Sequence, residues 1–127
     1  MNLNKGKNVL VVDDCEDNLL LMELLLQNEG YAIESANSGR KGLAKFDEQQ
    51  PDIIILDLMM PDISGLEFVR QLKDKYDISR IRIILLTANT NISHKDVKDI
   101  DAVCYKPFDI YKILDKIHSL LAVRLTI

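Results

Sequence analysis

The chain has 127 residues with no tryptophan, two cysteines, three prolines and no cluster of basic residues. Cys15 and Cys104 are too few for a disulfide framework and lack metal-site spacing, so we interpret both as free thiols. No apolar run approaches the roughly 18 residues of a membrane span, and the polar start MNLNKGKN is not typical of a signal peptide. The net charge of −4 argues against direct nucleic-acid binding. These absences predict a cytoplasmic protein that contacts neither membrane nor nucleic acid.

The composition is that of a globular domain, with 47% hydrophobic and 28% charged residues. This is enough apolar material for one full core. No internal repeat, low-complexity segment or linker divides the chain. We therefore expect a single domain over residues 1–127, with a core at about 8–123 and no output domain after it.

Five short, β-branched, apolar segments alternate with five segments of helical periodicity, which predicts a parallel sheet with helices on both faces. We assign the α/β class and a flavodoxin-like (βα)5 fold with strand order 2-1-3-4-5. In the first helix, the spacing of Leu20, Leu21, Leu24 and Leu25 predicts its buried face. The expected strands are 8–12, 31–36, 53–57, 81–87 and 102–105. The expected helices run from 17 until Gly30, from Ser38 to before Pro51, and over about 66–75, 91–100 and 109–123.

The segment PDIIILDLMMPDISG places a carboxylate, Asp57, directly at the end of an all-apolar strand. Three other strands also end in polar residues, which are Asp13 with Asp14, Thr87, and Lys106. In the expected order these four strands are contiguous, and their carboxyl ends share the edge where ligands bind in open α/β sheets. Neighbouring strands are about 4.8 Å apart, so only a long side chain such as Lys106 could reach Asp57 from two strands away.

Three carboxylates at one edge repel one another, and a divalent cation relieves that repulsion. An all-oxygen set without histidine or cysteine favours Mg²⁺. Three carboxylates, one Mg²⁺ and the Lys106 ammonium sum to zero charge, so a phosphoryl group would need the further donors that Thr87, Lys106 and backbone N–H groups offer. Because carboxylates act as nucleophiles in phosphoryl transfer, we expect a phosphoryl group on Asp57.

Four motifs, VLVVDD, IIILDLMMPDISG, ILLTA and YKPF, in that order, resemble the receiver domain of two-component response regulators, the CheY-like family. The resemblance spans almost the whole chain. It implies that Asp57 accepts a phosphoryl group from a phosphohistidine on a sensor histidine kinase or a phosphotransfer protein. Asp14, Asp57 and the Met59 backbone carbonyl would bind Mg²⁺ directly, and Asp13 would bind it through water. Thr87 would hydrogen-bond a phosphoryl oxygen and Lys106 would pair with it. The Lys106–Pro107 peptide would be cis.

The resemblance also implies a switch rather than an enzyme with external substrates. The domain would assist its own phosphorylation and dephosphorylation, and would change a partner-binding surface formed by the fourth helix, fifth strand and fifth helix. A homodimer through that surface is a further expectation, and the output partner is unknown. Two departures bear on this switch: Val103 stands where the family usually has an aromatic residue, and the segment from Thr87 to Lys106 is short and lacks a usual glycine.

Three other functions are alternatives to this one. A flavin-binding protein of the same fold would need a phosphate-holding loop after the first strand, where this chain has DDCEDN. A phosphatase with an aspartate nucleophile would need a general acid two residues after the nucleophile, where this chain has Met59. The main alternative is a degenerate receiver that acts as a phosphorylation-independent interaction module, which would typically lack one of the five site residues.

Overall fold

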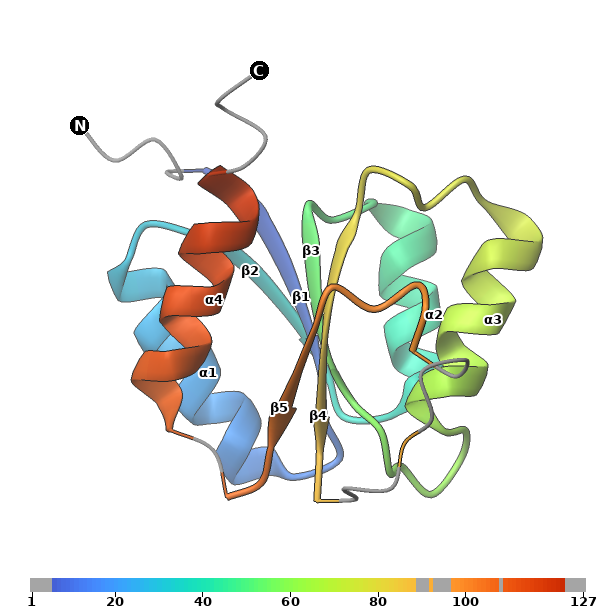
Figure 1. Ribbon diagram of the computed structural model, residues 1–127, viewed down its shortest axis with the longest axis horizontal. Coiled ribbons are helices and arrows are strands. Elements are labelled where there is room, and N and C mark those ends of the chain that lie inside the picture. The colour runs from blue at the N-terminus through green and yellow to red at the C-terminus, as the bar shows by residue number, and fades with distance from the viewer. Residues whose placement is uncertain (1–5, 89–91, 93–96, 108, 123–127) are drawn as a thin grey trace.

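The computed structural model describes residues 6–88, 92, 97–107 and 109–122. Its five-stranded sheet is parallel throughout, with the order β2-β1-β3-β4-β5 (Figure 1). This confirms the predicted fold class and strand order. The strands are β1 (Asn8–Val12), β2 (Ala32–Ala36), β3 (Ile53–Asp57), β4 (Arg82–Thr87) and β5 (Ala102–Tyr105).

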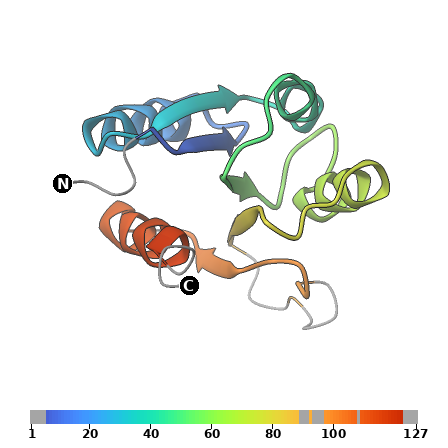
Figure 2. The ribbon, with the colours of Figure 1, turned by 90° about the horizontal axis from the view of Figure 1, so that it is seen from above.

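Helices cover both faces of this sheet (Figure 2). One face carries α1 (Glu16–Asn28) and α4 (Ile110–Ala122), and the other carries α2 (Gly39–Glu48) and α3 (Gly65–Lys75). Ser38 and Ser64 begin α2 and α3 as N-caps, each accepting a hydrogen bond from a backbone N–H of the first turn. No helix in the described ranges is long and apolar enough to cross a membrane.

The central strands β1, β3 and β4 are apolar on both faces because their alternate residues pack into two separate cores. In β3, for example, Ile53 and Ile55 pack under α1 and α4, while Ile54 and Leu56 pack under α2 and α3. All four are fully buried. This two-sided burial explains why the strands read as continuous apolar runs rather than as alternating patterns.

The buried face of α1 differs from the prediction. Leu19, Met22 and Leu26 are buried, whereas Leu20, Leu21 and Leu24 are 56%, 43% and 59% exposed. The segment LLLMELLL is apolar on nearly every side of the helix, so its periodicity did not select one face. Packing against the sheet determines which face of α1 is buried, and three leucines remain exposed to solvent.

The fourth expected helix, over 91–100, falls largely outside the described residues. Of that segment the structure describes 92 and 97–100, and residues 97–99 form a turn. The expected last helix is confirmed to Ala122, since α4 buries Ile113, Leu114, Ile117 and Leu121 against the sheet.

Candidate functional site

The strand register brings the predicted polar residues to one edge. Val12 of β1 is paired with Leu56 of β3. The residues that follow them, Asp13 and Asp57, are therefore neighbours. Asp57 is paired with Leu86, which puts Thr87 one residue beyond that pair. Asp13, Asp57 and Thr87 are the buried polar residues of the described structure, 1%, 2% and 0% exposed.

Three carboxylates gather at this edge. Asp13, Asp14 and Asp57 each offer one oxygen, and these oxygens lie within 4.8 Å of one another. Asp13 and Asp57 are buried and Asp14 is exposed, so the cluster opens to solvent on the Asp14 side. Hard oxygen donors in this arrangement fit Mg²⁺, which prefers one or two carboxylates and keeps several waters.

Lys106 supplies the positive charge. Its Nζ lies 3.2 Å from Oδ2 of Asp57 and 3.9 Å from Oδ2 of Asp13. The backbone N–H of Lys106 donates to the Thr87 carbonyl at 2.7 Å, which fixes the lysine at the end of β4. The Lys106–Pro107 peptide is cis, as expected.

Strand alternation explains why these groups converge. Val11, Ile55 and Cys104 belong to the core under α1 and α4, and residues two further along point to the same side. Those residues are Asp13, Asp57 and Lys106, so acids and lysine continue one face of the sheet beyond its apolar part.

Local hydrogen bonds hold the two buried acids. Asp13 accepts from the Cys15 backbone N–H at 2.9 Å and from the Asn18 side-chain amide at 3.2 Å. Asp57 accepts from the Met59 backbone N–H at 3.2 Å. Sequence reasoning missed Asn18, although a polar residue in the first turn after the acid pair is a signal that could have found it.

The carboxyl group of Asp57 is harder to ionise than that of an exposed aspartate. Burial and the neighbouring negative charge of Asp13 raise its pKa from 3.8 to about 6, while Lys106 and the Met59 N–H oppose that shift. The metal-free site therefore favours a proton on Asp57 more than an exposed aspartate would. A cation that offsets this charge repulsion is favoured at the site for the same reason.

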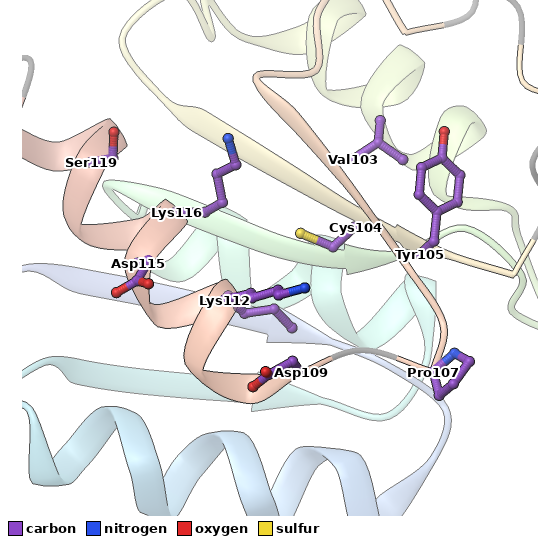
Figure 3. Close-up of a pocket in the computed structure, with 10 residues that line it drawn as sticks. Val103, Cys104, Tyr105, Pro107, Asp109, Lys112, Asp115, Lys116 and Ser119 are labelled. Carbon is purple, nitrogen blue, oxygen red and sulfur yellow. The ribbon is translucent and has the colours of Figure 1, made fainter.

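The Val103 position, where the family pattern has an aromatic residue, lies beside a groove between β5 and α4. The groove has a volume of ≈ 650 Å³, and Cys104, Tyr105, Lys112 and Lys116 are among the residues that line it. Figure 3 shows Cys104 directed toward α4, with Val103 and Tyr105 on the other side of the strand. Cys104 and Tyr105 therefore point to opposite sides of β5, as strand alternation requires, and Tyr105 is 49% exposed.

Comparisons with a family model and with curated proteins point to the same family. The sequence pattern of the response regulator receiver domain matches residues 9–118. The chain is 36% identical over 117 residues to the response regulator ArlR of Staphylococcus epidermidis, covering 90% of this chain and 52% of that protein. It is 38% identical over 122 residues to the transcriptional regulatory protein YkoG of Bacillus subtilis, covering 94% and 52%. The chain spans about half the length of these curated relatives.

Solved structures agree. The chemotaxis protein CheY4 of Vibrio cholerae superposes with a TM-score of 0.83 at 30% identity, covering 91% of this chain and 98% of that chain. The response regulator protein TrrA was solved in complex with the histidine kinase ThkA. It superposes with a TM-score of 0.78 at 36% identity, covering 91% of this chain and 98% of that chain. A two-component response regulator from Clostridium difficile, at 19% identity and a TM-score of 0.84 over 96% and 100%, shares the fold.

Proposed function

This chain belongs to the family of response regulator receiver domains, and from that membership we propose that it is a switch operated by phosphorylation of Asp57. One observation carries the proposal: the Lys106 ammonium lies 3.2 Å from the Asp57 carboxylate at an edge where Asp13 and Asp14 also gather. A buried acid with a cation at hydrogen-bonding distance and two further acids beside it matches the needs of an aspartyl-phosphate site.

In the proposed reaction, an Asp57 oxygen attacks the phosphorus of a phosphohistidine. The new P–O bond forms as the P–N bond breaks, and the electron pair returns to the imidazole nitrogen, which takes up a proton. Asp14, Asp57 and the Met59 backbone carbonyl are the proposed direct ligands of Mg²⁺, with Asp13 binding through water. The bound ion would offset the charge on the phosphoryl oxygens. Lys106 and the Thr87 hydroxyl hold the phosphoryl group, and slow hydrolysis by water resets Asp57.

Intact-mass analysis after treatment with acetyl phosphate tests this proposal directly. We expect a Mg²⁺-dependent adduct of roughly 80 Da on the wild-type chain and none on Asp57→Asn. The same two proteins without Mg²⁺ are the controls, and thermal unfolding confirms that the variant is folded. Beryllofluoride-treated protein also reports on the expected homodimer. Sedimentation velocity should show a faster-sedimenting species if two copies pair through the surface of the expected fourth helix, β5 and the last helix, which is α4 of the structure.

The main alternative is decided by the same experiment. A folded wild-type chain that acquires no adduct and binds no beryllofluoride would be an inert receiver. The chain would then be an interaction module that works without phosphorylation, and the proposal would fail.

The phosphoryl donor needs a docking surface, and α1 offers one. It begins two residues after Asp14, and Leu20 and Leu24 lie one turn apart on its exposed side. Exposed leucines on one helix face are typical of a surface that a partner covers. TrrA, which this chain resembles, was solved with a histidine kinase. We therefore propose that a histidine kinase contacts this face of α1.

Replacing both Leu20 and Leu24 by serine should slow phosphotransfer from kinases but not from acetyl phosphate. Loss of central apolar contacts at an interface lowers affinity by about tenfold or more. The measurement compares transfer from a panel of purified, autophosphorylated histidine kinases with transfer from the small donor. The double methionine variant keeps the apolar surface and is the control. Equal kinase rates in the serine and wild-type proteins would contradict docking through α1.

A further inference from the structure

The loop between β3 and α3, residues 58–64, is joined to the start of α2 by one side chain. The Asp62 carboxylate accepts from the Gly39 backbone N–H at 3.1 Å and from the Arg40 N–H at 2.8 Å. These two hydrogen bonds lower the pKa of Asp62. The carboxylate also lies at the positive end of the α2 dipole, which favours its charge. Asp62 is thus held to another element of the fold as an anion.

Asp62 completes the N-terminus of α2 in a way that Ser38 alone does not. The Ser38 hydroxyl accepts from the Lys41 N–H at 3.2 Å. The N–H groups of Gly39 and Arg40, which have no partner within the helix, are those that Asp62 accepts from. The same helix end therefore has two caps, one local and one supplied by the β3–α3 loop.

Apolar packing holds the same junction. A Cβ atom on Gly39 would lie 2.2 Å from Cγ1 of Ile63, so the loop sits closely against the first residue of α2. At its other end the loop is held by backbone hydrogen bonds, because the Leu58 N–H donates to the Leu86 carbonyl of β4 at 2.9 Å and the Leu58 carbonyl accepts from the Gly65 N–H at 2.8 Å. Met59 lies between these two anchors, and its N–H donates to Asp57.

We infer that Asp62 is a positioning residue of the phosphoryl site. By tying the middle of the loop to α2, it fixes the backbone at Met59, whose N–H holds Asp57 and whose carbonyl is a proposed Mg²⁺ ligand. The expected effect of Asp62 on Mg²⁺ binding rests on the proposed function. Its expected effect on the Met59 backbone does not, since the hydrogen bond from Met59 to Asp57 is present without metal.

The test compares Asp62→Ala with Ser38→Ala. Both variants remove a cap from the same end of α2, but only the first removes hydrogen bonds that join the loop to α2. We expect Asp62→Ala to weaken Mg²⁺ binding by about tenfold, as loss of groups that orient metal ligands typically does. Ser38→Ala should bind Mg²⁺ as the wild type does. Calorimetric titration is suited to this comparison because the chain has no tryptophan.

Two further measurements separate positioning from helix stability. Asp62→Asn keeps one acceptor oxygen and should recover most of the affinity. In metal-free protein, hydrogen exchange at the Met59 amide should become faster in Asp62→Ala and stay unchanged in Ser38→Ala.

Wild-type Mg²⁺ affinity in Asp62→Ala, or an equal loss in Ser38→Ala, would overturn the inference. A wild-type chain that binds no Mg²⁺ would instead count against the proposed function. The exchange rate at Met59 would then decide the positioning role by itself.

Discussion

Replacing Lys106 by methionine should slow phosphorylation of Asp57 by acetyl phosphate about 10²-fold, the typical effect of removing one donor aimed at developing negative charge. The Lys106 Nζ lies 3.2 Å from Asp57 and 3.9 Å from Asp13, so one side chain offsets two buried acids. Methionine keeps the length and the apolar stem but leaves that charge unbalanced. The rate is measured by intact mass over time at saturating Mg²⁺.

A second effect of the substitution has to be separated from the first. Because Lys106 lowers the pKa of Asp57, its loss also raises that pKa above about 6. Rates are therefore compared at a pH well above this value, where Asp57 is ionised in both proteins. Lys112→Met, which removes a lysine of the neighbouring groove, is the matched control. Phosphorylation of Lys106→Met at the wild-type rate would show that the lysine only balances charge in the resting site.

The sheet and most of the site could be predicted from the sequence because one physical pattern encodes both. A strand that is buried on both faces must be apolar throughout, so a polar residue directly after it marks the sheet edge. Asp13 and Asp57 carry this signal, because β1 and β3 are buried on both faces, whereas Lys106 follows β5, whose residues are only partly buried or exposed. Their order along the chain, with parallel crossovers, was enough to predict that they converge.

Features that depend on packing between distant segments could not be predicted in the same way. The leucine spacing in α1 does not distinguish the buried from the exposed leucines, because a helix that is apolar on nearly every side has no periodicity to orient it. The contact of Asp62 with α2 joins residues 22 and 23 positions apart. In sequence, an aspartate between a proline and a glycine indicates only a turn.

Gly65→Ala should damage the site through the backbone rather than through a side chain. A Cβ atom there would lie 2.7 Å from the Asp57 carbonyl oxygen and 3.0 Å from the Leu58 Cα, and neither atom can rotate away. We expect a loss of about 1–3 kcal/mol in the free energy of unfolding, as for other overpacked positions. Because the residue that must move is Asp57 itself, Mg²⁺ affinity should also fall by about tenfold.

Gly42→Ala distinguishes damage to the site from loss of stability in general. A Cβ atom on Gly42 would lie 2.8 Å from Cγ2 of Val12 and 2.9 Å from Cε2 of Phe68, which are side-chain atoms of the core. This variant overpacks the protein without pressing on the backbone of Asp57. Chemical denaturation and Mg²⁺ titration of both variants should therefore show two losses of stability but one loss of affinity. If affinity fell equally in both, the site would depend on the rigidity of the whole core, and the close approach of Gly65 to Asp57 would have no special role.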